Sequence, residues 1–167
     1  MAIHAAVVST PEAQQMRFSR YDNPSKWDLA AAAEVRQAVN ETEGKTFTEF
    51  AVFNLQAGRD PVLQPFIMSE LARQGRWNQE PFLKLLESQD LELLVMQENV
   101  LGLEGSDVYT KEMITALKLN YKLDRTIPTG TRRTYYLLRP KTEKDRREEN
   151  DRLVWDWSRP QSDRLLN

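Results

Sequence analysis

The hydrophobic pattern of this chain centres on one nearly continuous apolar run. Residues 91–97 read Leu-Glu-Leu-Leu-Val-Met-Gln. Such a run is typical of a strand that is covered on both faces, because a strand with one wet face alternates apolar and polar residues. We therefore predict that Leu91–Met96 is the central strand of a sheet.

Helical spacing dominates the chain before this run. Ser25 and Asp28 form the pattern of a capping box, which predicts a helix that ends near Gly44. Residues that recur on one face of this helix form the stripe that we expect to be buried: Trp27, Ala31, Val35, Ala38 and Val39. Residues 45–50 are short and β-prone, and residues 51–58 indicate one or two helical turns.

Two further helices are predicted between residues 65 and 87. Pro65 suits a first helical position, and Gly75 suits a helix end. Asn78 is expected to cap the second helix, whose apolar residues face inward: Phe82, Leu83, Leu85 and Leu86. A later helix is predicted from about Tyr109 to Asn120, with its buried face formed by Met113, Ile114, Leu117 and Tyr121.

The chain then alternates through residues 122–127, turns at Pro128-Thr129-Gly130 and returns through residues 132–139. This pattern predicts a hairpin, with Tyr135 and Leu137 on one face and Tyr136 and Leu138 on the other. Strands that alternate with helices favour an α/β fold, in three α/β/α layers, with a mostly parallel sheet and an antiparallel hairpin at one edge.

The predicted organisation is one domain with two extensions. Residues 1–24 are expected to be an irregular arm, residues 25–140 a single α/β domain, and residues 141–167 a charged linker or helix followed by a tail with two tryptophans. The charged run contains pairs such as Glu143 with Arg147, typical of a solvated helix. Trp155 and Trp157 are interpreted as clamping the tail onto the domain rather than binding sugar.

Composition narrows the possible chemistry. The 167 residues carry a net charge of -2, which provides no global field for a nucleic acid. The chain has no cysteine, so thiol catalysis and thiolate metal sites are excluded. No apolar run approaches the roughly 20 residues of a membrane-spanning helix. We therefore expect no cofactor, no metal site and no transmembrane segment, and a soluble chain that is cytoplasmic if it is expressed alone.

Acidic side chains offer the first candidate site. Glu49 and Asp60 each follow a predicted strand or apolar segment, where open α/β sheets place ligand crevices. Together they would suit acid–base chemistry or the binding of sugar hydroxyls. The simpler interpretation, two surface acids, stays open.

Arg76 and Trp77 offer the second candidate site, at the corner between two predicted helices. The tryptophan suits a structural plug, with the arginine stacked on its ring or near a helix end. It would also suit stacking on a sugar, with the guanidinium on a carrier phosphate. Neither interpretation requires catalysis.

The order of these motifs resembles a known family. The matching segments are Thr48-Glu49, Ala57-Gly58, Gln64-Pro65-Phe66, Leu71 to Trp77, Leu91 to Met96, Glu112-Met113, Asn120-Tyr121 and Tyr135 to Pro140. Together they resemble the extracytoplasmic C-terminal domain of GT-C type membrane glycosyltransferases, which are similar to protein mannosyltransferases and use polyprenyl-phosphate sugars. Glu70 to Trp77 is the most specific stretch. Phe50 stands where the family motif has a second acid, which weakens a carboxylate site.

The resemblance implies a non-catalytic tail domain, because the membrane helices and the loop that carries the catalytic aspartate in that family have no counterpart among these segments. It implies a membrane glycosyltransferase core or a lipid-linked sugar as partner, and a place on the extracytoplasmic face of the membrane when the domain is part of such a protein. Its role would be to shape the acceptor or carrier site. The alternative is a small stand-alone enzyme or ligand-binding protein with a site near Glu49 and Asp60.

Overall fold

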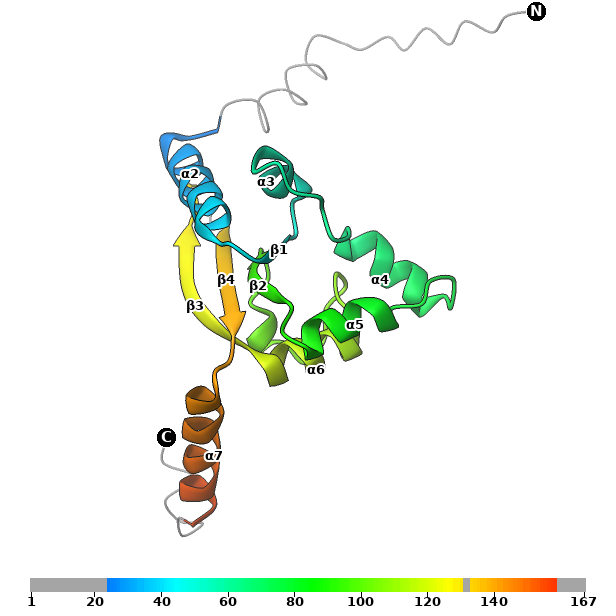
Figure 1. Ribbon diagram of the computed structural model, residues 1–167, viewed down its shortest axis with the longest axis vertical. Helices are drawn as coiled ribbons and strands as arrows, with labels where there is room; N and C mark the ends of the chain where they lie inside the picture. The colour runs from blue at the N-terminus through cyan, green and yellow to red at the C-terminus, as the bar shows by residue number, and fades with distance from the viewer. Residues whose placement is uncertain (1–23, 131–132, 159–167) are drawn as a thin grey trace, which may run out of the picture.

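The structure is a computed structural model that describes the backbone of residues 24–130 and 133–158, and side chains as far as Asp151 (Figure 1). Of the predicted arm, residues 1–24, all but Pro24 therefore lie outside the described residues. The elements, in chain order, are α2 (Lys26–Glu41), β1 (Lys45–Thr48), α3 (Ala51–Gln56), α4 (Pro65–Arg73), α5 (Glu80–Glu87), β2 (Leu91–Met96), the 3-10 turn η1 (Val100–Gly102), α6 (Lys111–Asn120), β3 (Tyr121–Pro128), β4 (Thr134–Pro140) and α7 (Glu143–Ser158).

The chain has a mixed α/β architecture around a four-stranded sheet of order β1-β2-β4-β3. β1 and β2 are parallel, whereas β2 with β4 and β3 with β4 are antiparallel. The prediction of a mostly parallel sheet is therefore wrong. The hairpin turn forces β3 and β4 to be antiparallel, and β4 rather than β3 then pairs with β2, so only the long helical connection between β1 and β2 produces a parallel pair.

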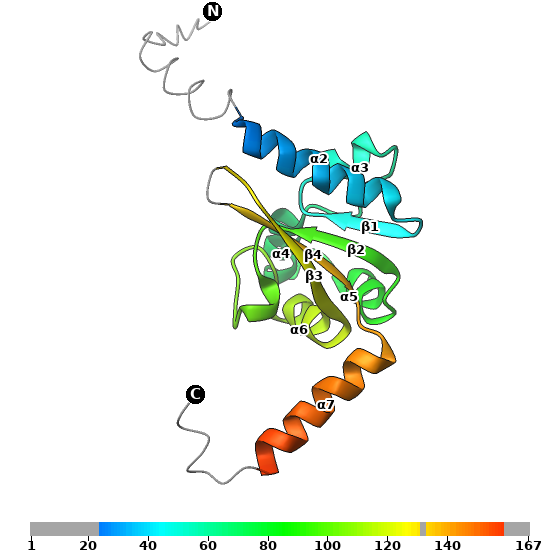
Figure 2. The same cartoon turned by 90° about the vertical axis from the view of Figure 1, so that its left-hand side faces the viewer.

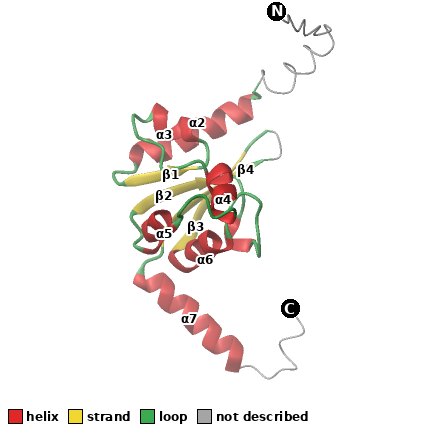
Figure 3. Cartoon of the chain, turned by 90° about the vertical axis from the view of Figure 1, so that its right-hand side faces the viewer, coloured by secondary structure: helices red, strands yellow, loops and turns green. Residues whose placement is uncertain are grey.

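β2 is an inner strand, as the apolar run predicts, and five of its six residues are buried. Its alternate residues feed two clusters on opposite faces of the sheet. Leu93 and Val95 pack with residues of α2, α3 and the hairpin, whereas Leu94 and Met96 pack with residues of α5 and α6. Figure 2 shows the sheet between these groups of helices, and Figure 3 looks onto the side with α4, α5 and α6.

Local sequence signals place most helix ends. The Ser25–Asp28 capping box is present, and Pro65 is the first residue of α4. α2 ends at Glu41, three residues before Gly44. Asn78 is a correction: the N-cap of α5 is Gln79, which makes no side-chain capping bond, and Asn78 lies one residue earlier, where its Oδ1 accepts the N–H of Glu80 at 3.0 Å.

Trp27 is a correction to the predicted buried stripe of α2. Its side chain is 64% exposed, while the other four residues of the stripe are buried. The reason is its place in the first helical turn, beside the tip of the hairpin at Gly130, where α2 has not yet reached the sheet face. The Lys26 ammonium lies 5.2 Å from the centre of the exposed ring.

The outer edge of β1 is covered by side chains from the α3 region. Asn54, which is 1% exposed, donates to the carbonyl of Thr46 at 2.9 Å and accepts the Thr46 hydroxyl at 3.1 Å. Arg59 donates to the carbonyls of Gly44 and Thr42. These contacts pair backbone groups that would otherwise be exposed at a sheet edge.

Candidate functional site

Polar residues gather where the two parallel strands end. The N–H of Glu49, just after β1, donates to the carbonyl of Val95 at 2.9 Å, so Glu49 lies beside the end of β2. Gln97 and Glu98 follow β2 directly. Because the carboxyl ends of parallel strands meet at one edge of a sheet, this edge is the usual position of a ligand site in α/β folds.

The carboxylate of Glu49 joins the strand ends to a loop. Its Oε2 accepts the N–H of Gln97 at 2.8 Å and the hydroxyl of Tyr109 at 3.0 Å. Both donors act on the same oxygen, so Oε1 has no partner among the described residues. The Glu49 side chain is half-buried.

The charge of Glu49 is not neutralised by the described residues. Burial raises the pKa of Glu49 above its ordinary 4.5; the hydrogen bonds from Gln97 and Tyr109 oppose this, and the negative charge of Glu98 adds to it. No lysine or arginine in the described part of the chain lies within ion-pair distance of this carboxylate. The folded domain therefore makes the ionised form of Glu49 less favourable than it is in water.

The loop of residues 97–110 is fixed in place around Glu49. The Ser106 hydroxyl donates to Glu98 Oε2 at 2.5 Å and accepts the N–H groups of Val108 and Tyr109. From α4, the Arg73 guanidinium donates to the carbonyls of Ser106, Asp107 and Tyr109. These hydrogen bonds hold the loop in place, so the donors around Glu49 are preorganised and do not depend on a free loop.

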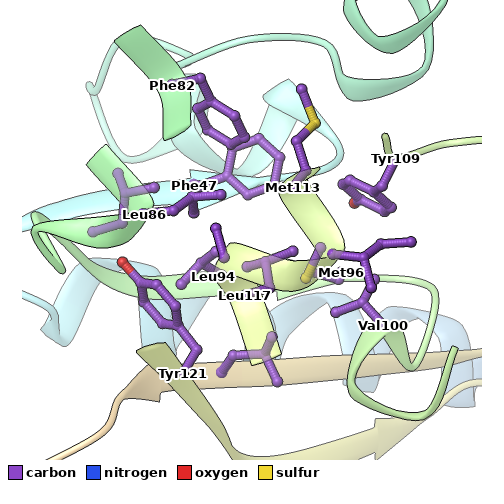
Figure 4. Packing of buried hydrophobic residues seen from close by; sticks show 14 residues of the cluster. Phe47, Phe82, Leu86, Leu94, Met96, Val100, Tyr109, Met113, Leu117 and Tyr121 are labelled. Atoms are coloured by element: carbon purple, nitrogen blue, oxygen red, sulfur yellow. The ribbon is translucent and has the colours of Figure 1, made fainter. Parts of the chain in front are cut away.

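Two tyrosines complete the cluster. Tyr109 is 1% exposed, and its ring lies in the core beside Met96 and Met113 (Figure 4). Burial first, and the Glu49 carboxylate second, raise the pKa of Tyr109 well above 10.0, so it remains a hydrogen-bond donor at neutral pH. Burial also raises the pKa of Tyr135 of β4, and the Gln97 side chain opposes this shift.

Asp60 does not join this cluster. Its side chain is exposed, and its backbone carbonyl accepts Asn54 Nδ2 at 3.3 Å, the same amide nitrogen that donates to Thr46 near the start of β1. Asp60 therefore lies beside the first half of β1, whereas Glu49 lies beyond its end. No hydrogen bond and no shared partner joins Glu49 to Asp60 among the described residues, and their pairing stays a prediction.

Arg76 and Trp77 form the corner between α4 and α5. Gly75 has φ 67° and closes α4, and the N–H of Arg76 donates to the Leu71 carbonyl at 2.8 Å, the Schellman pattern of a helix end. The Arg76 side chain is exposed. Trp77 is half-buried and packs against the core cluster of α5 and α6, the position that a structural plug would occupy.

Two open hollows lie along α6, with volumes of about 370 and 350 Å³. The first is lined by Ala72, Arg73, Gln79, Thr110, Lys111 and Glu112. Several of its polar groups are already used, since Arg73 donates to carbonyls of residues 106–109 and Thr110 donates to Gln79 at 2.7 Å. Neither hollow involves Glu49, so the strand-end cluster remains the stronger candidate.

Sequence reasoning missed Gln97, Glu98, Ser106 and Tyr109. The available signal was the polar pair Gln97-Glu98 at the end of the central strand, the position that should be searched first in an α/β fold. In the described residues, no group of three or more histidine, aspartate or glutamate side chains could hold a metal ion. None of the described helices is long and apolar enough to cross a membrane.

Comparison of the chain with protein-family models, curated proteins and solved structures gave no match.

Proposed function

We propose that the chain is a non-catalytic tail domain of the kind found in GT-C membrane glycosyltransferases. We propose further that Glu49, in the strand-end cluster, binds a hydroxyl-bearing group of the acceptor or the sugar. The observation that carries the proposal is the uncompensated, half-buried charge of Glu49. A neutral glutamine oxygen would accept the same two hydrogen bonds at a lower desolvation cost. The charge is therefore kept for something other than the fold.

The chemistry favours a hydroxyl over a phosphate. Glu98 is close enough for its negative charge to disfavour that of Glu49, and an anion placed there would meet both charges. A sugar or acceptor hydroxyl, in contrast, donates to a carboxylate oxygen, and such charge-assisted bonds contribute about 1.5–3 kcal/mol. Glu49 Oε1 is the acceptor that we assign to this role.

The order of elements supports the family part of the proposal. β1 ends at Thr48-Glu49, α4 begins at Pro65-Phe66, the Gly75-Arg76-Trp77 corner follows α4, and β4 ends in Arg139-Pro140. This is the order that the resemblance implies. The predicted three-layer α/β/α arrangement belongs to the same proposal, and the clusters on both sides of the sheet support it.

The alternative is a small stand-alone α/β enzyme or ligand-binding protein with a site near Glu49 and Asp60. Their positions beside different parts of β1 give that pair no geometric support. We therefore do not propose paired-acid catalysis by these two residues.

The test is a titration of the isotope-labelled chain with a short-chain, water-soluble polyprenyl-phosphate sugar, followed by amide NMR. We expect shifts at Gln97 and Tyr109, a dissociation constant at least about tenfold weaker in Glu49→Gln, and no change in Asp60→Asn, the matched control. Inorganic phosphate alone should cause no shift at these amides.

The same samples test the absence of catalysis, because released carrier can be measured after long incubation with a range of acceptors. Release above background would overturn the non-catalytic assignment. Equal affinity in the two variants, or the absence of any shift at Gln97 and Tyr109, would overturn the assignment of Glu49.

A further inference from the structure

Three described helices of this chain end in the same motif, and one of them has a different residue at the decisive position. α3 and α4 are followed by glycines, Gly58 with φ 68° and Gly75 with φ 67°, whereas α5 is followed by Gln89 with φ 58°. In each case the N–H of the next residue returns to the last turn of the helix, and for α5 this bond runs from Asp90 to Leu85. Glycine adopts this left-handed conformation freely and glutamine does not, so Gln89 has a role that its backbone alone does not explain.

The side chain of Gln89 links the ends of three elements, α5, α6 and β4. Its Nε2 donates to the carbonyl of Asn120, at the end of α6, at 2.7 Å and to the carbonyl of Lys141, just after β4, at 3.0 Å. The N–H of Lys141 also donates to the Asn120 carbonyl, at 2.8 Å. A glycine at position 89 would relieve the backbone and lose this bridge.

The bridge lies at the base of α7. Lys141 Nζ donates to the carbonyl of Lys118 at 2.8 Å and pairs with Glu149 of α7 at 2.6 Å, with its side chain only 10% exposed. Lys122 of β3 pairs with Asp145 at 2.8 Å, and Asp145 also accepts the N–H of Thr142, which starts the helix. The first turns of α7 are thus attached to α6 and β3.

As far as Asp151, where its described side chains end, α7 carries only polar and charged residues. Two pairs form within the helix, Glu143 with Arg147 at 3.5 Å and Lys144 with Glu148 at 3.8 Å. The first of these pairs is the one that the sequence predicts. Figures 1 and 2 show the helix extending away from the sheet. A helix of 16 residues is about 24 Å long.

We propose that α7 is a rigid strut, clamped at its base by Gln89, Lys141 and Lys122, that holds its far end at a set distance and direction from the sheet. A flexible linker would need none of these contacts, and a helix that packs on the domain would need an apolar face. The described part of α7 combines a fixed base with a polar surface, which is the combination a spacer needs.

Because the chain has no cysteine, two spin labels can be introduced without a background. We would label Arg36→Cys on α2 and Asp151→Cys on α7, both exposed positions, and measure their distance distribution by pulsed electron spin resonance. We expect one narrow distribution. Gln89→Gly should at least double its width while leaving the melting temperature unchanged or higher, since glycine suits this backbone conformation.

Lys141→Met should broaden the distribution in the same way. Lys144→Ala removes an exposed pair that lies within α7 and does not attach it to another element, so it should not broaden the distribution. Far-UV circular dichroism on the same samples separates swinging from unwinding, because a helix that swings keeps its ellipticity. A broad distribution in the labelled parent, a width unaffected by Gln89→Gly, or a loss of helical signal that matches the broadening would each overturn the strut.

Discussion

Substituting Glu49 in two different ways separates the need for its hydrogen bonds from the need for its charge. Glu49→Ala removes the acceptor of the Gln97 N–H and of the Tyr109 hydroxyl. A hydrogen bond contributes about 1 kcal/mol net, and an unsatisfied buried donor costs more, so we expect a loss of about 2–4 kcal/mol. Glu49→Gln keeps an acceptor for both donors and removes the buried charge. It should be as stable as the parent at neutral pH, or more stable.

The pH dependence has a definite sign. Because the pKa of Glu49 is raised in the folded chain, the folded chain binds a proton at Glu49 more tightly than the unfolded chain does. The contribution of Glu49 to stability is greatest below its unfolded pKa, near 4.5, and falls as the pH rises through the folded pKa. In Glu49→Gln, this fall in stability with rising pH should be absent.

The assay is urea unfolding of the parent and both variants at several pH values between 4 and 8. The difference in unfolding free energy between Glu49→Gln and the parent should grow in favour of glutamine as the pH rises. If Glu49→Gln were less stable than the parent at pH 7 by as much as Glu49→Ala, the charge would be serving the fold, and the central argument for a ligand would be refuted.

Two further substitutions test the packing. Leu93 is fully buried in β2, so Leu93→Asp should cost several kcal/mol and unfold the domain; a soluble variant with a cooperative melt would contradict the inner position of β2. Trp77 is only half-buried, so Trp77→Ala should cost about 2 kcal/mol, below the usual 3–5 kcal/mol for a buried aromatic residue. A melting curve unchanged by Trp77→Ala would instead favour a ligand-stacking role.

Local patterns predicted the elements well because their causes are local. The apolar run gave β2 its bounds, and the Ser25–Asp28 box and Gly75 marked helix ends through hydrogen bonds that span a few residues. Trp27 matched the helical period but failed burial, because whether a helical turn lies over a sheet depends on where that sheet ends. The side chains of Trp155 and Trp157 lie outside the described residues, so their clamping role stays a prediction.

The candidate site was only half predictable because its contacts are distant in sequence. Glu49 was chosen correctly as a residue at a strand end, but its partners Gln97 and Tyr109 lie 48 and 60 residues away. Which strand neighbours which depends on pairing that no single segment encodes, and the same uncertainty concealed β4 between β2 and β3. Asp60 shares no partner with Glu49 among the described residues, and its place in a site stays a prediction.

The cover that Asn54 and Arg59 place over β1 limits how this domain can associate with others. Sheets often recruit a further strand from a neighbouring chain through the free backbone groups of an outer strand. Here the carbonyls of Thr42, Gly44 and Thr46 already have side-chain donors. A fifth strand could enter on this side only by displacing a buried asparagine, so growth of the sheet into a filament or a strand-exchanged dimer is disfavoured at β1.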